Sequence, residues 1–594
     1  MTDHKPDIAM AERHPENESI NKPHGLDSED VKGHDFTLEQ SDLPKGYFRS
    51  LNFIGSIFCI GANLGAGTGA FALIAPILSF VDADIGPSPN LNWVALSYLL
   101  TSSIGLAFVG RLTDIFGRRW FFIGSGILAT IGSIVCATAP TINALIAGEC
   151  LLGLASAGQI LYGAPISELV PMKHRFWAQG YAVTWTIPTS SMSAIVGYAF
   201  VYQTSVGWRG VFYFLIALNA LITVAFFLFY RPPNFSMKHG GRSKVQYIKQ
   251  FDYVGAFLFI AGMLFFIMGL SWGGSLHPWK SASVIATIVV GFLCLVAFAL
   301  YETLVPMEEP FVPIHIFKDR AFVIATLMWS LGASVYYANA ILWPSMVFTL
   351  FASDHGVMWA GWASCLANAG ITLGELFVPL GTIFKKRHWQ IRAAFFGGSV
   401  FVACMATCNQ DTFSRAAVLM FFGSLLIGYN EIANSTVITL AVADQREIGT
   451  ANGIASSLRN CISTICSTVY TTVLANRLAS TIPAQVPSAL IKAGLPSGSV
   501  AAFLAALSGA GKMSAVDGVT PAIEAIGVRA YKGASSDAFR TVFLTTLAFS
   551  GLGMVLSIFY PNVDPLLTNK VSVQIHSKGK EDVGAEVKRV DSQV

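Results

Sequence analysis

Long apolar runs recur along the chain and are separated by short polar stretches. An α-helix of about 20 residues crosses the roughly 30 Å of hydrocarbon in a bilayer, and each run is close to that length or longer. We read fourteen runs, near residues 51–80, 92–110, 119–138, 142–165, 177–201, 208–230, 253–272, 283–304, 321–350, 357–384, 393–409, 414–441, 449–474 and 539–560. The pattern predicts an all-α polytopic membrane protein.

The composition strengthens this prediction. Of the 594 residues, 53% are hydrophobic and 12% are charged, and the mean hydropathy is +0.56. A soluble protein carries about 25% charged residues. All nine cysteines lie in apolar runs, so we expect no disulfides and no cysteine-based metal site. No basic patch with interleaved aromatic residues is present, which argues against a nucleic-acid partner.

Lysine and arginine are concentrated in alternate short loops, whereas loops 82–91 and 351–356 have none. Positive charge is favoured on the cytoplasmic side of a membrane. The asymmetry therefore predicts a multi-pass protein with both termini cytoplasmic and an even number of spans. The enriched positions are Arg111, Arg118, Arg119, Lys173, Arg175, Lys238, Arg242, Lys244, Lys249, Lys318, Arg320, Lys385, Lys386, Arg387 and Arg392.

Three long segments lie outside the runs. Residues 1–48 and 561–594 are polar, and we expect them to be disordered cytoplasmic tails, with no cleavable signal peptide. Residues 475–538 are rich in small residues and are predicted to be extracellular, either as a mobile surface loop or as a site for a partner.

An internal repeat divides the chain. Gly148 and Gly153 in the fourth run recur at the same spacing as Gly423 and Gly428 in the twelfth, and a basic loop at 385–392 falls where a second copy of loop 110–119 is expected. The repeat predicts an N-terminal six-helix half (49–231), a linker with two extra spans (232–320) and a C-terminal six-helix half (321–560).

The loop GRLTDIFGRR carries the densest charge cluster in the first half of the chain. Gly110 permits a close approach of two helices, and Gly117 permits a sharp turn. Asp114 and Arg118 are four residues apart and can form an ion pair, which could gate the cytoplasmic side. The remaining basic residues of the loop are Arg111 and Arg119.

This loop resembles the signature between helices two and three of the major facilitator superfamily. Four further stretches point the same way: LIAGECLLGLASAG, ELVPMKHR, WRGVFYF and REIGTANGIASSLRN, which begin at Leu145, Glu168, Trp208 and Arg446. Across residues 45–565 the chain looks most like the fungal trichothecene efflux pump family. The resemblance implies a major facilitator fold of fourteen helices, in which two six-helix halves flank two extra spans.

The same resemblance implies a secondary active transporter that exports an organic metabolite, toxin or drug by proton antiport and alternating access. Two features depart from the family pattern: Glu149 stands where an arginine is usual in span four, and of the Gly-Pro-x-x-Gly-Gly string of span five only Pro188 remains. Two alternatives stay open, a ferric-siderophore importer of the same fold and a non-transporting membrane receptor.

Four charged residues lie inside the predicted spans, where an unpaired charge is costly. Arg459 lies at a depth similar to those of Glu375 and Glu431, so an ion pair is expected there. Such a pair is either a fixed structural contact or part of proton coupling. Glu149 has no basic neighbour in the sequence and is the first candidate for proton coupling, unless it reaches the outer water.

An aromatic stripe in the ninth run predicts either a cavity wall or a lipid-facing packing surface, with Trp343 in the belt of aromatic residues at the membrane interface. Trp329, Tyr336 and Trp343 are seven residues apart and share one helical face, with Asn339 nearby. A cavity with aromatic and polar groups suits a bulky organic solute. Further polar contacts are expected from Gln159, Tyr162, Asn430 and Asn434.

No enzyme is predicted, because the spans hold neither an HExxH pair nor a nucleophile constellation. The absence of a GxxxxGK[ST] loop argues against ATP as the energy source. We expect no cofactor or metal. The expected partners are a small organic substrate, protons and the lipid bilayer, and the expected state is a monomer in the plasma membrane or, alternatively, in a vacuolar or vesicle membrane.

Overall fold

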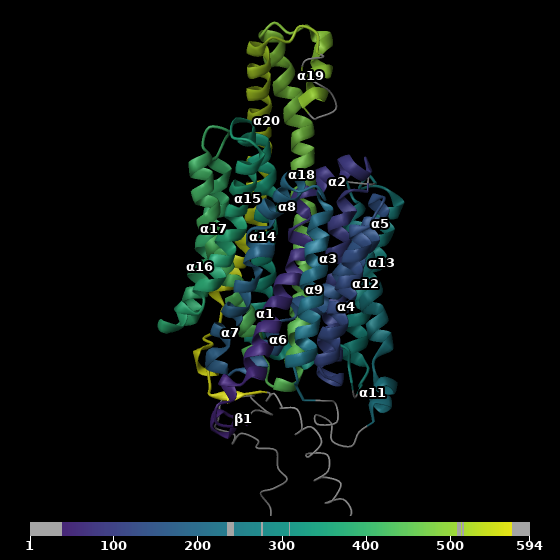
Figure 1. Ribbon diagram of the computed structural model, residues 1–594, viewed down its shortest axis with the longest axis vertical. Coiled ribbons are helices and arrows are strands. Elements are labelled where there is room, and N and C mark those ends of the chain that lie inside the picture. The colour runs from purple at the N-terminus through teal and green to yellow at the C-terminus, as the bar shows by residue number, and fades with distance from the viewer. Residues whose placement is uncertain are drawn as a thin grey trace, which may run out of the picture.

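The computed structural model of the protein describes residues 38–572 except 89, 234–242, 275–276, 308, 508–512 and 514–515. These residues form a tall bundle of helices (Figure 1). We call the end that carries strands β1 and β2 the lower end, and the end from which α19 projects the upper end. The predicted loop residues Lys238 and Arg242 and the outer parts of both tails lie outside the described residues.

Helices account for nearly all of the regular structure. The N-terminal half contains α1 (Leu51–Ala72), α2 (Leu78–Ile85), α3 (Asn92–Phe116), α4 (Arg119–Ala137), α5 (Ile142–Ile160), α6 (Gly163–Leu169), α7 (Arg175–Val183), α8 (Ser193–Gln203) and α9 (Arg209–Phe229). The linker contains α11 (Lys244–Gln250), α12 (Tyr253–Trp272) and α13 (Ala282–Leu304). The C-terminal half contains α14 (Arg320–Leu350), α15 (Val357–Phe377), α16 (Arg387–Cys404), α17 (Phe413–Ala441), α18 (Ile448–Lys492), α19 (Val500–Leu507) and α20 (Pro521–Ile558).

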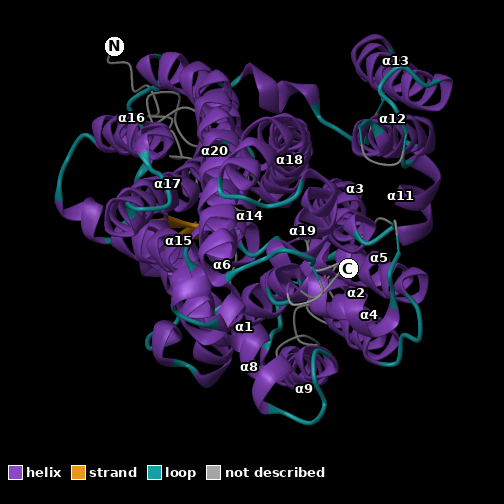
Figure 2. Ribbon diagram, turned by 90° about the horizontal axis from the view of Figure 1, so that it is seen from above, coloured by secondary structure: helices purple, strands orange, loops and turns teal. Residues whose placement is uncertain are grey.

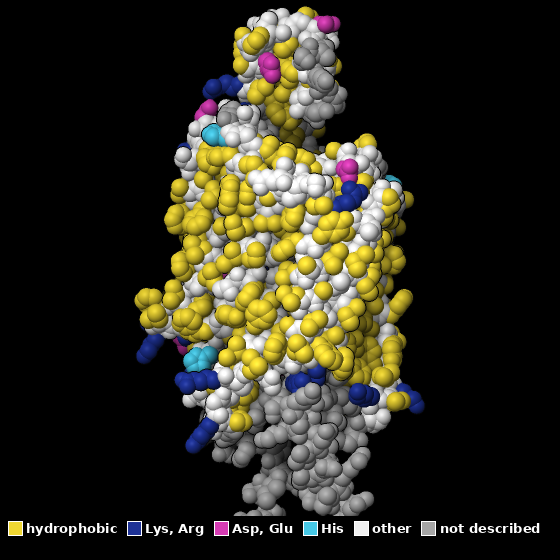
Figure 3. All heavy atoms as spheres, in the orientation of Figure 1, with side chains coloured by type: hydrophobic (Ala, Val, Ile, Leu, Met, Phe, Trp, Pro, Cys, Tyr) yellow, Lys and Arg dark blue, Asp and Glu magenta, His cyan; other side chains and the backbone are white. Residues whose placement is uncertain are grey.

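The two linker helices α12 and α13 stand at the edge of the bundle (Figure 2). Helix α12 contacts both α3 and α18, so it covers the seam between the two halves. Only 11% of the most apolar stretch of α13 is buried, so this helix presents its side chains to lipid. Apolar side chains cover most of the visible flank of the bundle, and Lys and Arg gather near its lower edge (Figure 3).

Among the described residues, twelve helices are long and apolar enough to cross a membrane. The other two predicted spans are helical but differ from these. Residues 177–201 are divided between α7 and α8, and residues 449–474 lie in α18, where many Ser, Thr and Asn residues replace aliphatic ones. Since β1 (Leu38–Glu39) pairs with β2 (Lys570–Val571), the chain between them begins and ends at the same end of the bundle. This pairing requires an even number of crossings, while the exact count of fourteen stays a prediction.

Side-chain caps fix where several helices begin. The hydroxyl of Ser50 accepts a hydrogen bond from the N–H of Phe53 at the start of α1, and Asp319 accepts two N–H bonds at the start of α14. Each cap satisfies backbone donors that have no partner within the helix. Several spans therefore begin at a polar residue next to an apolar run.

Between α7 and α8 the helix is irregular over Thr184–Ser191, with a 3₁₀ turn followed by a π-type turn, Ile187–Ser191. Pro188 lacks the N–H needed for a regular helical bond. Thr186 donates its hydroxyl hydrogen to the carbonyl of Val183, and this bond competes with the backbone hydrogen bonds of a regular α-helix. The predicted fifth span is therefore bent where it passes the centre of the bundle.

The inner parts of both tails are ordered, contrary to the prediction of disorder for residues 1–48 and 561–594. Residues 38–48 and 561–572 cross the lower end, where β1 and β2 pair antiparallel. Tyr47, Val563 and Val571 are buried in the main apolar core, and this burial orders the segments.

The segment 475–538 also differs from the predicted mobile loop. Helix α18 continues to Lys492, and α19 and the first half of α20 complete a helical projection above the bundle (Figure 1). The projection has its own apolar core of Val486, Leu490, Phe503 and Ile523. These residues are scattered between positions 486 and 523 and are diluted by Ala and Ser, so their clustering depends on the fold of the segment.

Phe503→Ala is expected to destabilise the projection by about 3 kcal/mol, because the ring is fully buried and its removal leaves a cavity in the core of the projection. Limited proteolysis should then cleave residues 475–538 faster than in the native chain. Ile491→Ala, at a position 51% exposed, is the matched control and should leave the cleavage rate unchanged. Equal cleavage of both variants would contradict the assigned core.

Candidate functional site

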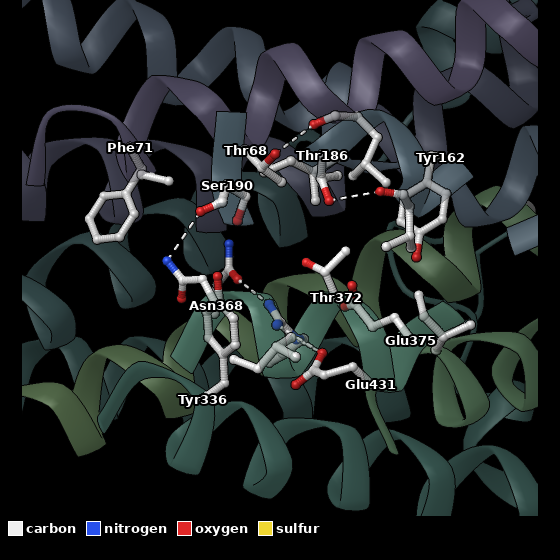
Figure 4. A pocket seen from close by; sticks show the side chains of 18 of the residues that line it. Thr68, Phe71, Tyr162, Thr186, Ser190, Tyr336, Asn368, Thr372, Glu375 and Glu431 are labelled. Carbon is white, nitrogen blue, oxygen red and sulfur yellow. Dashed lines mark hydrogen bonds and ion pairs between the residues drawn. The ribbon is translucent and has the colours of Figure 1, made fainter. Parts of the chain in front are cut away.

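A cavity of about 120 Å³ lies at the centre of the bundle, between the two halves. Residues of α1, α3, α5 and the irregular turn line it from the N-terminal half, and residues of α14, α15, α17 and α18 line it from the C-terminal half. Figure 4 shows the polar residues that point into it. A pocket for a drug-sized molecule measures about 300–1,000 Å³, so a bulky ligand requires the halves to separate.

An ion pair with two aromatic neighbours forms one wall of the cavity. Arg459 of α18 lies 2.9 Å from Oε2 of Glu431 of α17, and the indole N–H of Trp329 donates to the same oxygen at 2.7 Å. The guanidinium lies 5.2 Å from the ring centre of Trp329 and 6.0 Å from that of Tyr336. The predicted pairing of Arg459 with a carboxylate at its level is confirmed for Glu431.

Glu375 of α15 also lines the cavity, but it has no hydrogen-bond or ion-pair partner among the described residues. Figure 4 shows Glu375 and Tyr162 toward the same end of the cavity, with Glu431 nearby. A carboxyl group in this position can exchange a proton whenever the cavity opens to water. It is therefore the acid in the cavity that is most available for proton transfer.

Two polar contacts cross the cavity and join the halves. The amide nitrogen of Asn368 on α15 lies 3.2 Å from the carbonyl oxygen of Ser190, and the hydroxyls of Thr372 and Ser191 are 2.5 Å apart. Ser190 and Ser191 belong to the irregular turn of the N-terminal half. The bend in the fifth span thus brings backbone and hydroxyl groups within reach of α15.

A buried ion-pair cluster closes the bundle at the lower end. Arg118 lies 2.9 Å from Asp114 and 2.5 Å from Glu168, and all three residues are buried. The second oxygen of Asp114 accepts hydrogen bonds from the backbone N–H and the hydroxyl of Thr450, at 2.6 and 2.8 Å. Because Thr450 is on α18, the cluster fastens α3 of one half to the other half. The predicted Asp114–Arg118 pair is confirmed.

Glycine residues allow this closure. Gly117 ends α3 with φ of 92°, a conformation that favours glycine, and the resulting turn lets Arg118 fold back onto Asp114. A Cβ atom on Gly110 would lie 2.5 Å from the carbonyl oxygen of Gly449 and 2.9 Å from the Cα of Gly453. The close approach of two helices predicted at Gly110 is confirmed, and the second helix is α18.

The other two arginines of the loop point elsewhere. Arg111 pairs with Glu309 of the linker at 2.7 Å, whereas Arg119 donates to the carbonyl of Phe227 within its own half. His315, six residues after Glu309 in the linker, contacts Glu447 at the start of α18. Burial raises the pKa of Glu447, and the facing His315 opposes that rise. The linker is therefore fastened to both halves at the lower end.

Arg175 forms a second buried contact between the halves, one that the sequence analysis did not assign. Its guanidinium donates to the carbonyl of Thr439 at 2.6 Å, to Gln445 at 2.7 Å and to Ser572 at 2.9 Å. The first two partners belong to the C-terminal half, and the third follows β2. The lower closure thus includes the C-terminal segment.

Several predicted cavity residues lie outside it and are fixed by buried hydrogen bonds. Gln159 donates to Asn219, and Trp343 donates to the carbonyl of Ala363. The same holds for Asn339, Asn430 and Asn434, whose partners are Ser424, the carbonyl of Ile391 and Tyr560. Of the residues expected in the cavity, Tyr162, Trp329 and Tyr336 line it. The alternative of a lipid-facing Trp343 is wrong, because its side chain is fully buried.

Glu149 is fully buried between α4 and α5 and does not line the cavity. One carboxylate oxygen lies 4.0 Å from the sulfur of Cys136, and the other has no hydrogen-bond partner in the described part of the chain. The alternative of an acid that reaches the outer water is therefore wrong. Its assignment to proton coupling stays a prediction.

The cavity residues Asn368 and Thr372 were missed, although the sequence carries a signal for them. With Glu375 they repeat at intervals of four and three residues, so they form a polar stripe along one face of an otherwise apolar helix. Thr450, Ser190 and Glu309 have no comparable signal, because their roles depend on contacts between segments far apart in the sequence.

Comparison with known proteins bears on the family and on the fold of the chain. A family model described as a fungal trichothecene efflux pump matches residues 24–593. A trichothecene efflux pump of Fusarium sporotrichioides is 29% identical over 547 residues, which is 91% of either chain. A pump with the same description from Trichoderma arundinaceum is 30% identical over 71% of this chain and 70% of its own. The crystal structure of the human organic anion transporter MFSD10 superposes with a TM-score of 0.52 over 85% of this chain and 99% of its own, at 11% identity, a likeness that concerns the fold alone.

Gly110→Leu is expected to force α3 and α18 apart, because the new side chain meets backbone atoms of α18. Spin labels at the exposed positions His174 and Lys385, in a background without native cysteines, should report a wider separation of the lower ends. Gly124→Leu is the matched control, since a Cβ atom there meets nothing within 4 Å. An unchanged distance distribution in Gly110→Leu would contradict the closure described for the lower end.

Arg459→Gln is expected to destabilise the protein by about 3 kcal/mol, because Glu431 would be left as a buried, unpaired charge. The double variant Glu431→Gln with Arg459→Gln should recover part of that loss. Thermal unfolding in detergent measures both effects. Arg529→Gln, which removes the exposed contact with Asp411, should cost at most about 1 kcal/mol. A double variant as unstable as the single one would argue against the pair as the cause.

Proposed function

Because the chain belongs to the fungal trichothecene efflux pump family, we propose that it exports an organic secondary metabolite, toxin or drug by proton antiport. The observation that carries this proposal is the central cavity, which holds an acid, Glu375, with no hydrogen-bond or ion-pair partner among the described residues, next to a buried ion pair. Transporters of this architecture bind their solute between two halves that rock about a central site. The cavity occupies that position.

Alternating access supplies the motion in this proposal. The lower closure consists of separable contacts, among them Asp114–Thr450 and the bonds of Arg175 to Thr439 and Gln445. Their loss would open the cavity toward the lower end and admit a bulky solute. Their return would favour release at the upper end, because contacts made in only one conformation bias a two-state equilibrium.

The lower end faces the cytoplasm in this proposal. Lys and Arg gather near that edge in Figure 3, which agrees with the preference for positive charge on the cytoplasmic side. Both described ends of the chain lie there as well. We place the protein in the plasma membrane as a monomer, with the helical projection outside the cell.

Glu375 is the acid that we assign to proton coupling. In a cavity open to the upper side it would take up one proton, and in a cavity open to the lower side it would release that proton to the cytoplasm. Glu431 is held by Arg459 and Trp329 and is less available for the exchange. Glu149 lies outside the cavity, so a proton path to it would need a further opening between α4 and α5.

The experiment is directional flux in yeast without its own pumps. Cells are loaded with a trichothecene, a fluorescent apolar dye or a ferric siderophore, with and without a proton uncoupler. We expect loss of the trichothecene or the dye that the uncoupler blocks. Glu375→Gln should slow this loss at least tenfold, because the amide cannot carry the proton.

Glu524→Gln, on the exposed surface of the projection, controls for the loss of one carboxylate and should export normally. Export that survives in Glu375→Gln with its uncoupler sensitivity intact would exclude Glu375, and loss of export in Glu149→Gln alone would assign the role to Glu149. Accumulation of the siderophore without export of either organic compound would overturn the proposed function in favour of import.

A further inference from the structure

The amide nitrogen of Asn368 has hydrogen-bond partners, whereas its amide oxygen has none among the described residues. Its nitrogen donates to the carbonyl oxygen of Ser190 at 3.2 Å and to the hydroxyl of Ser193 at 3.4 Å. Its oxygen is buried and has no hydrogen-bond partner among the described residues. Since a carbonyl oxygen only accepts, the NH₂ group has to face Ser190, and the amide cannot be turned round. The atom without a partner is therefore an acceptor.

Asn368 lies on the wall of the central cavity. It belongs to the polar stripe of α15 with Thr372 and Glu375, and all three residues line the cavity. Figure 4 shows the Asn368 amide with its nitrogen directed at Ser190. A buried acceptor without a partner is unfavourable unless a ligand or water donates to it. Because Asn368 lines the cavity, separation of the halves would bring this acceptor within reach of a bound molecule.

The polar groups around the cavity share this acceptor character. Thr68 and Thr186 donate their hydroxyl hydrogens to backbone carbonyls of their own helices, at 3.0 and 2.9 Å. The indole of Trp329 donates to Glu431, whose other oxygen is buried and has no hydrogen-bond partner in the part of the chain that the structure describes. These hydroxyl oxygens and the second oxygen of Glu431 can each accept a hydrogen bond, as the Asn368 oxygen can, and the matching chemistry on a ligand is a hydrogen-bond donor.

We propose that Asn368 determines specificity by accepting a hydrogen bond from a hydroxyl group of the transported compound. The inference rests on the proposed export function and names a chemical feature of its substrate. A site built to accept from a hydroxyl group discriminates strongly against an analogue without one, because the acceptor is then left buried and unpaired. The bond to Ser190 fixes the amide in the orientation that such recognition requires.

A purely structural role for Asn368, as a contact between α15 and the irregular turn, makes a different prediction. That role depends on the NH₂ group, whereas recognition depends on the oxygen. Asn368→Asp removes the donor and keeps an acceptor, while Asn368→Leu removes both in a similar volume. The two variants therefore separate the two roles, and either remains informative if the other is poorly produced.

The test measures export of a radiolabelled trichothecene alcohol and of its O-methyl ether from the same yeast cells, normalised to the amount of protein at the cell surface. The native chain should export the alcohol at least tenfold faster than the ether. Asn368→Leu should reduce this preference at least tenfold, and Asn368→Asp should retain it. Ser364→Ala, which removes a buried hydroxyl one turn away on α15 and outside the cavity, should behave like the native chain.

An unchanged preference in Asn368→Leu would overturn the inference and leave the export function standing. Equal loss of preference in Asn368→Leu and Asn368→Asp would also overturn it, because the NH₂ contact would then be the cause. Export of neither compound by the native chain would overturn the proposed function for this class of compound, and the inference with it.

Discussion

The cost of burying charge in an apolar bundle is the constraint on which the closed structure depends. Arg118 and Arg175 are fully buried at the lower end, where an unpaired charge would be strongly unfavourable. Arg175 bonds directly to residues of the C-terminal half. Arg118 is linked to that half indirectly, because its partner Asp114 bonds to Thr450. The halves therefore cannot separate at this end until those groups find water or new partners. At the upper end the contact is apolar, with Tyr198 packed against Phe348, and it imposes no such requirement.

Features that depend on local spacing could be predicted from the sequence. The apolar runs locate the helices, and the spacing of four positions from Asp114 to Arg118 suffices for an ion pair once Gly117 turns the chain. The pair Arg459–Glu431 follows from similar depths in two spans, because burial leaves a charge few alternatives. The family could be recognised for a similar reason, since its motifs are contiguous strings.

Contacts between distant segments could not be predicted in this way. Thr450 is 336 residues from Asp114, and Ser572 is 397 residues from Arg175. Which face of a span turns inward also depends on neighbouring helices, so Asn339 and Trp343 share a stripe with cavity residues and yet bond within the C-terminal half. The helical fold of the projection could not be predicted from the sequence, because its apolar residues are sparse. They form a core only when α18, α19 and α20 are packed together.

The polar stripe on α15 links ligand and proton in the proposed mechanism. Asn368 and Thr372 each contact the irregular turn of the other half, and Glu375 follows within one turn on the same helical face. A ligand that bonds to Asn368 and a proton that neutralises Glu375 would both act where α15 meets the N-terminal half. Two ligands that bias the same two-state contact change each other's affinity by the same factor. Coupling between solute and proton can thus arise at a single helix interface, without a path of contacts through the rest of the protein.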